Sequence, residues 1–189
     1  MEALFASFAM VAVAEIGDKT QLLSFILAAR FRGRHGAVIA GIFAATVLNH
    51  LFAALVGGWV AHALGPDLLR WLLALAFFAF AAWALIPDTL EAEPKTGRYG
   101  AFGTTLVLFF IAEMGDKTQL ATVALGAKYA SLTLVTLGTT LGMMAANVPA
   151  VLVGESLARR FPLAAMRYVA AALFAVFGLA ILLRLDLRI

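Results

Sequence analysis

Long apolar stretches separated by short polar segments make up most of this chain. Six of them reach the roughly 20 residues that a helix needs to cross a hydrocarbon core of about 30 Å. They cover approximately residues 3–29, 37–62, 68–87, 100–127, 131–157 and 163–184. Because a segment in lipid must satisfy its backbone hydrogen bonds internally, each stretch is predicted to be a helix. The pattern therefore predicts an all-α integral membrane protein with six transmembrane helices.

Composition supports a chain that is surrounded by lipid. Hydrophobic residues make up 63% of the 189 residues and charged residues only 13%, whereas about 25% is usual for a soluble domain. The chain has no cysteine, which excludes disulfides and thiolate metal ligands. Its net charge of +3 is spread over short clusters between apolar stretches, so we expect a bilayer as partner and no nucleic acid.

The distribution of Lys and Arg predicts how the chain is oriented. Outside the repeated motif described below, the loops after the first, third and fifth stretches carry Arg30, Arg32, Arg34, Lys95, Arg98, Arg159, Arg160 and Arg167. The opposite side carries Arg70, Lys128, Arg184 and Arg188. Because basic loops tend to stay in the cytoplasm, both termini are predicted to lie on the non-cytoplasmic side of the cell (inner) membrane.

One polar motif occurs twice at corresponding places. The segment AEIGDKTQLLS at 14–24 recurs as AEMGDKTQLAT at 112–122, with eight of eleven positions identical at an offset of 98. The same offset carries Asn49 onto Asn147 in the following stretch. Because the polar positions are the most similar part, a duplication kept only for packing does not explain the repeat.

The repeat predicts the domain organisation. Residues 1–88 form a first repeat of three helices with the motif in its first helix, 89–98 form a charged linker, and 99–189 form a second repeat of the same kind. Because three is an odd number, the second repeat enters the membrane upside down. This is the inverted-repeat plan of secondary transporters, whose ion sites lie near the membrane midplane where the repeats meet.

The motif carries charges that are costly in a membrane, roughly 2.5–3.5 kcal/mol each. On a continuous helix, Glu15, Asp18 and Lys19 share one face. The same holds for Glu113, Asp116 and Lys117. Four acids and two lysines sum to −2, which suits one divalent cation, and oxygen ligands favour Mn²⁺, Mg²⁺ or Ca²⁺. We therefore predict that the four acids are the metal ligands.

Further polar residues surround these acids in the pattern. Lys19 and Lys117 are predicted to balance charge by occupying carboxylates that hold no metal. Supporting positions in the cation site are predicted for Gln21, Gln119, Asn49, Asn147, Thr20 and Thr118. Gly17 and Gly115 lack side chains, which permits close approach of an ion or local unwinding of the helix.

Other interpretations of the motif remain open at this stage. Glu15–Lys19 and Glu113–Lys117 as buried salt bridges would serve packing in a structural membrane subunit, but they leave the aspartates unexplained. An intramembrane metalloenzyme is disfavoured because the chain has no paired histidine ligands. Transport of another small cation or an amino acid would also fit a polar site.

The doubled motif resembles the Glu-x-Gly-Asp-Lys-Ser/Thr signature of the cation/proton antiporter family that includes the Golgi manganese and calcium transporter and bacterial manganese exporters. The resemblance covers essentially the whole chain. It implies export of Mn²⁺ or Ca²⁺ in exchange for protons, with ion binding by the motif acids, no catalysis and no cofactor besides the transported cation. The chain lacks the extra N-terminal helix of eukaryotic members, which favours manganese efflux. Oligomeric state cannot be predicted from the sequence.

Overall fold

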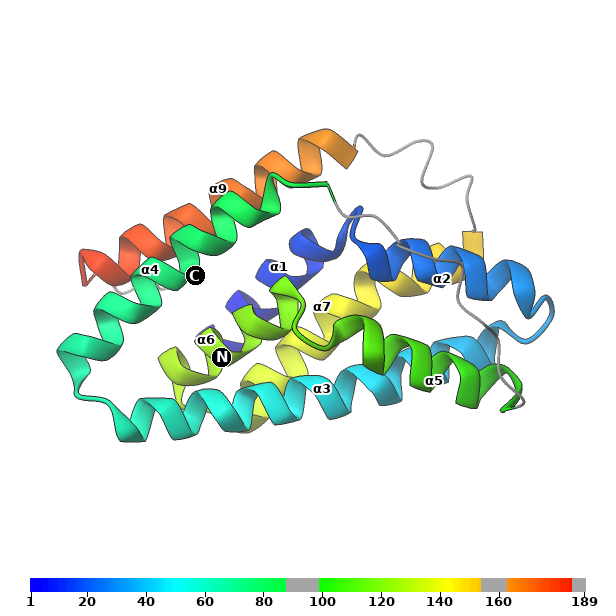
Figure 1. The fold of residues 1–189 in the computed structure, drawn as a ribbon, viewed down its shortest axis with the longest axis horizontal. Helices are drawn as coiled ribbons and strands as arrows, with labels where there is room; N and C mark the ends of the chain where they lie inside the picture. Colours follow the sequence, from blue (N-terminus) through cyan, green and yellow to red (C-terminus); the bar gives the residue numbers. More distant parts are fainter. Residues whose placement is uncertain (88–98, 154–162, 185–189) are drawn as a thin grey trace.

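The computed structural model describes residues 1–87, 99–153 and 163–184 (Figure 1). Within these ranges the chain is helical, with turns between the helices and no strand. The helices are α1 Glu2–Glu15, α2 Lys19–Arg30, α3 His35–Ala63, α4 Pro66–Ala84, α5 Gly100–Glu113, α6 Lys117–Tyr129, α7 Leu132–Val153 and α9 Leu163–Leu182. The all-α class expected from the sequence is confirmed.

Among the described residues, four helices are individually long and apolar enough to cross a membrane. They are α3, α4, α7 and the segment Ala165–Leu182 of α9. Helix α5 is apolar but has only 14 residues. The predicted stretches at 37–62, 68–87, 131–157 and 163–184 correspond to the four long helices, while the two that carry the motif do not form single helices.

The prediction of a continuous helix through each motif is wrong. The stretch 3–29 is divided into α1 and α2, and the stretch 100–127 into α5 and α6. Gly17 and Gly115 lie in the turns between them with φ of 85° and 74°. Glycine adopts this left-handed conformation without the steric cost that a side chain would bring. The face shared by Glu15, Asp18 and Lys19 therefore does not exist.

An aspartate begins the helix after each turn. Asp18 is the N-cap of α2 and accepts a hydrogen bond from the backbone N–H of Thr20 at 3.4 Å. Asp116 caps α6 in the same way, at 3.5 Å from the N–H of Thr118. Because the first N–H groups of a helix have no partner within it, an aspartate at this place favours a new helix start over continuation.

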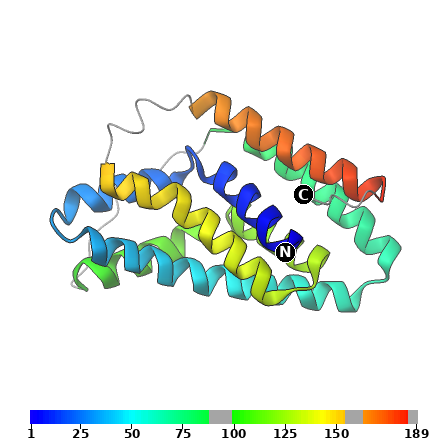
Figure 2. The ribbon, with the colours of Figure 1, turned by 180° about the vertical axis from the view of Figure 1, so that it is seen from behind.

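The two halves of the chain, before and after residues 88–98, interleave. Helices α1 and α2 pack on α7, while α5 and α6 pack on α3 (Figures 1 and 2). Helices α3 and α7 also contact each other, and α4 pairs with α9. Close approach depends on small residues: a Cβ on Gly126 of α6 would lie 2.8 Å from the carbonyl oxygen of Ala54 in α3. Each broken helix thus rests on a helix of the other half.

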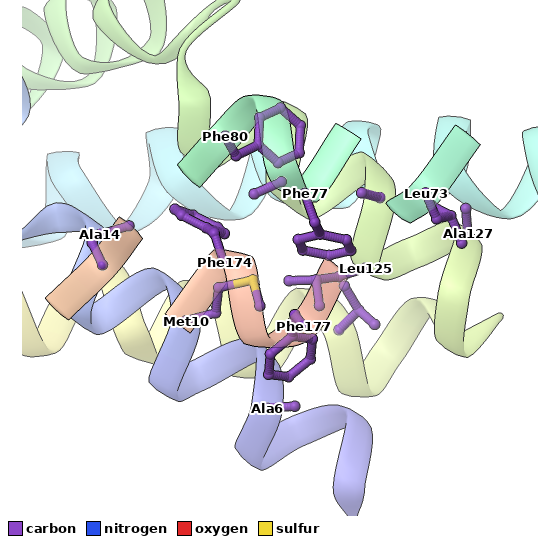
Figure 3. Close-up of a cluster of buried hydrophobic side chains, with 14 of the residues drawn as sticks. Ala6, Met10, Ala14, Leu73, Phe77, Phe80, Leu125, Ala127, Phe174 and Phe177 are labelled. Carbon is purple, nitrogen blue, oxygen red and sulfur yellow. The ribbon is translucent and has the colours of Figure 1, made fainter. Parts of the chain in front are cut away.

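Two apolar clusters lie on either side of the motifs. One gathers α1, α4, α6 and α9 around Phe77, whose ring centroid is 6.3 Å from that of Phe174 and 5.8 Å from that of Phe177 (Figure 3). The other joins α2, α3, α5 and α7 around Leu27 and Phe109. Because the first turn links α1 to α2 and the second links α5 to α6, each turn runs from one cluster to the other. The polar motifs therefore occupy the layer between the two apolar clusters.

The α4–α9 pair covers one part of this arrangement. It packs against α1 and α6, and has no comparable packing against α2 or α5 in the described residues. The turn of the first motif lies beside α4 and α9, since Gly17 of the turn, Ala84 of α4 and Arg167 of α9 line one small cavity. The turn of the second motif is more open, since Met114 there is 60% exposed.

Candidate metal centre

The charged residues of both motifs meet in the interior. Five of them are at most 3% exposed, namely Glu15, Asp18, Glu113, Asp116 and Lys117. The sixth, Lys19, has a side chain that is 27% exposed. The sequence-based expectation that the acids of both motifs converge agrees with this arrangement.

Two ion pairs join one motif to the other. Lys19 Nζ lies 3.0 Å from Asp116 Oδ1, and Lys117 Nζ lies 2.5 Å from Asp18 Oδ1. Each lysine thus reaches the aspartate that caps the corresponding helix of the other half. The pairing follows from the broken helices, because the turn at each glycine separates the lysine from the glutamate four positions before it.

The glutamates keep part of their hydrogen-bonding capacity unused. Thr20 Oγ1 donates to Glu15 Oε2 at 2.7 Å, and Thr118 Oγ1 donates to Glu113 Oε2 at 3.3 Å. Thr118 also donates to Asp116 Oδ2 at 3.2 Å. The other oxygen of each glutamate, Oε1, is buried without a hydrogen-bond partner among the described residues. Buried oxygens of this kind are costly unless a cation or proton satisfies them.

Three carboxylates are close enough to share an ion. Glu15, Glu113 and Asp116 each offer one oxygen, and these oxygens lie within 4.8 Å of one another. Oxygens on opposite sides of a divalent ion at 2.0–2.6 Å are separated by roughly 4–5 Å. Carboxylates this close repel one another, so the cluster is stabilised by a cation or by protons. All three side chains offer hard oxygen donors, which suit Mn²⁺, Mg²⁺ and Ca²⁺.

The motif glutamines hold the two turns. Gln21 Oε1 accepts the backbone N–H of Gly17 at 3.0 Å, and Gln119 Oε1 accepts that of Gly115 at 2.8 Å. Gln21 Nε2 donates to the carbonyl of Ala146 in α7 at 3.2 Å. Both carboxamides therefore stabilise the conformation of their turn, and Gln21 also links the first turn to α7.

The two asparagines anchor the motif segments of the opposite half. Asn49 Nδ2 donates to the carbonyl of Phe110 at 3.2 Å, and its Oδ1 accepts from Gln119 at 3.1 Å. Asn147 Oδ1 accepts from Ser24 Oγ at 2.7 Å. Their role as metal ligands stays a prediction. Sequence reasoning missed Ser24, although it follows Gln21 by three positions and corresponds to Thr122 in the second motif segment.

Membrane-length apolar helices around a buried cluster of carboxylates and ammonium groups define an integral membrane protein that handles a small cation. A comparison with protein families identifies the family to which this membrane protein belongs. The family model described as "Divalent cation/proton antiporter GDT1" matches residues 3–92 and 101–187. The chain belongs to this family of divalent cation/proton antiporters. The expectation of a multi-pass antiporter rather than an enzyme is thereby confirmed.

Individual relatives extend over nearly the whole chain. A Vibrio cholerae protein named "Putative manganese exporter" is 50% identical over 181 residues, covering 95% of this chain and 90% of that protein. GDT1-like protein 5 of Arabidopsis thaliana is 29% identical over 221 residues, covering 94% and 93%. GDT1-like protein 3 of Oryza sativa subsp. indica is 27% identical over 208 residues, covering 95% and 73%. No solved structure matches the chain significantly.

Proposed function

We propose that this antiporter exports Mn²⁺ from the cytoplasm across the cell (inner) membrane in exchange for protons, with Ca²⁺ as a second possible cargo. The observation that carries the proposal is the buried cluster of oxygens from Glu15, Glu113 and Asp116 within 4.8 Å of one another. Family membership supplies the exchange of a divalent cation for protons. The Vibrio cholerae relative, by its name, favours manganese and the outward direction.

In the proposed site, Glu15, Glu113 and Asp116 form the first ligand set, and Asp18 joins when Lys117 releases it. Lys19 and Lys117 hold the two aspartates through the ion pairs at 3.0 and 2.5 Å. Metal binding has to compete with these ammonium groups, because a divalent cation and an ammonium repel each other at such distances. When the metal leaves, the lysines return and keep the carboxylates from being left without a positive charge.

Protons use the same carboxylates in this scheme. Four acids and two lysines carry a net charge of −2 when all are ionised, so either one divalent cation or two protons neutralise the cluster. Carboxylates that share a site take up protons more readily because they repel one another. Exchange of two protons for one cation is then electroneutral, and the same site cannot hold both at once.

We further propose six membrane crossings in two inverted repeats. Helices α1 and α2 have 14 and 12 residues, and α5 and α6 have 14 and 13. At about 1.5 Å per residue, each pair is long enough to cross the hydrocarbon core as one broken span. Broken spans place helix ends at midplane ion sites in secondary transporters. Alternating access then arises when one half rocks against the other. The basic loops favour an orientation with both termini outside the cytoplasm.

The test is transport by the purified protein in proteoliposomes with a pH-sensitive dye inside. We expect Mn²⁺ movement to be accompanied by opposite proton movement, with Ca²⁺ competing less effectively. Asp116→Asn keeps the size and one oxygen but removes a charge, so exchange should fall at least tenfold and metal affinity should fall with it. If Asp116→Asn exchanged Mn²⁺ for protons with wild-type affinity and pH dependence, the carboxylates would be structural and the proposal would be wrong.

A further inference from the structure

A small cavity lies between the first motif and the α4–α9 pair. Its volume is about 10 Å³, close to the minimum that holds one water molecule. The walls include Gly17 and Asp18 of the turn, Lys117 of α6, Ala84 of α4, and Arg167 and Ala170 of α9. A divalent cation with its bound waters is far larger than this space. The cavity is therefore too small for the hydrated ion in this conformation.

The described residues around this cavity carry a net positive charge. Among them, the charged side chains that line the cavity are Asp18, Lys117 and Arg167, which together carry one net positive charge. Asp18 and Lys117 already form an ion pair. Arg167 makes no ion pair or hydrogen bond with the described residues. A guanidinium keeps its charge under all physiological conditions, so Arg167 adds a permanent positive charge beside the candidate metal centre.

The counterpart of this cation in the first half is Arg70 of α4, because an offset of 97 carries Arg70, Phe77 and Phe80 onto Arg167, Phe174 and Phe177. Arg70 pairs with Asp67 at 3.7 Å and does not line this cavity. The turn of the second motif is open, with Met114 60% exposed, and the Lys19 side chain beside it is 27% exposed. The two sides of the cluster thus differ in packing.

We propose that Arg167 is an electrostatic barrier that prevents the divalent cation from passing between the first motif and the α4–α9 pair. The cation then reaches and leaves the site on the side of Lys19 and Asp116 while this conformation lasts. This inference rests on the proposed metal site. The ion cannot leave between the first motif and the α4–α9 pair, so it crosses the membrane only when this pair moves. That movement is the step that exchange with protons requires.

The absence of cysteine makes a direct test possible. Arg167→Cys removes the charge, and a thiol reagent that attaches an aminoethyl group restores it, whereas a methyl reagent does not. In proteoliposomes with an internal pH dye, we expect Arg167→Cys to pass Mn²⁺ with at least twofold fewer protons moved per ion than the wild type. The aminoethyl adduct should return the ratio to the wild-type value, and the methyl adduct should leave it low.

Arg184→Cys is the matched control. Arg184 lies beyond the C-terminal end of the same helix, where it pairs with Asp67 at 2.9 Å on the exposed surface. This variant should keep the wild-type ratio with or without reagent. A wild-type ratio in Arg167→Cys would overturn the inference, and so would equal rescue by the methyl and aminoethyl reagents, since shape rather than charge would then matter.

A second variant keeps the test valid if Arg167→Cys does not fold. Ala170 follows Arg167 by three positions and lines the same cavity, so Ala170→Asp places a carboxylate beside the guanidinium. Ala170→Asp should lower the proton-to-metal ratio at least twofold, while Ala170→Asn of equal size should not. An unchanged ratio in folded Ala170→Asp contradicts the barrier. A wild-type protein that moves no Mn²⁺ against protons would instead refute the proposed function.

Discussion

The two ion pairs differ in burial, although the two motifs that supply their residues have matching sequences. The side chains of Lys117 and Asp18 are 4% and 0% exposed, whereas those of Lys19 and Asp116 are 27% and 2% exposed. The cost of removing one partner depends on whether the other can reach water. A buried charge left alone is strongly unfavourable, while a partly exposed lysine can turn outward.

Asp18→Asn is therefore expected to destabilise the fold more than Asp116→Asn. Asp18→Asn removes the carboxylate charge that lies against the buried Lys117 ammonium, and breaking a buried pair in this way costs about 3–5 kcal/mol. The loss for Asp116→Asn should be smaller, because the Lys19 side chain is 27% exposed and its ammonium is less strongly desolvated. Unfolding of the detergent-solubilised variants by heat or denaturant would measure the difference. Adding Lys117→Met to Asp18→Asn should recover most of the stability but not the transport, and equal losses in both single variants would contradict the difference in burial.

At the scale of elements, the broken helices show that hydropathy predicts an apolar stretch but not a break within it. The stretches 3–29 and 100–127 have the length and apolar character of continuous spans, and a three-residue turn barely changes either. The signals for the break were local: a glycine, then an aspartate two positions before a threonine whose N–H it caps. The repeat was enough to identify the motif residues. Their contacts were predicted wrongly, because helical spacing pairs each lysine with the glutamate of its own motif, whereas the structure pairs each lysine with the aspartate of the other motif.

Gly115→Ala tests the turn conformation alone. No atom lies within 4 Å of a Cβ built on Gly115, so the only penalty is the positive φ of 74°. That conformation costs a residue with a side chain about 1–2 kcal/mol. We expect a loss of stability of this size and slower exchange, measured by unfolding and by Mn²⁺ flux.

Gly58→Ala is the matched control for this substitution. Gly58 also has open space around its Cβ but lies within α3, where alanine is favoured over glycine by about 0.5–1 kcal/mol. It should be neutral or slightly stabilising. Equal effects of the two substitutions would show that the turn is not under conformational constraint.

At the scale of the whole molecule, the interleaving of the halves could not be predicted from the repeat. An offset of 98 residues shows that two segments are alike, but it does not show that α1 and α2 rest on α7 while α5 and α6 rest on α3. Nor did it predict that α4 and α9 would pack on one side only, because the repeat implies equal sides. Those features depend on long-range packing, which no local pattern encodes.

Orientation in the membrane is testable with two cysteines. Gly36, near the basic loop after α2, and Gly65, before α4, are exposed and have nothing within 4 Å of a built Cβ. Because Arg30, Arg32 and Arg34 favour the cytoplasm, Gly65→Cys should react with an impermeant maleimide in intact cells. Gly36→Cys should react only after the cells are broken. The reverse pattern would place both termini in the cytoplasm.

The crosswise ion pairs also bear on how the protein is made. Lys19 emerges from the ribosome 97 residues before its partner Asp116. At a synthesis rate of about 5–20 residues per second, the first motif waits for roughly 5–20 s without the carboxylate that neutralises its lysine. Three charges in one broken helix are poorly tolerated by lipid during that interval. The nascent first half therefore has to be sheltered by the insertion machinery, or enter the bilayer late, until the second half arrives to complete it.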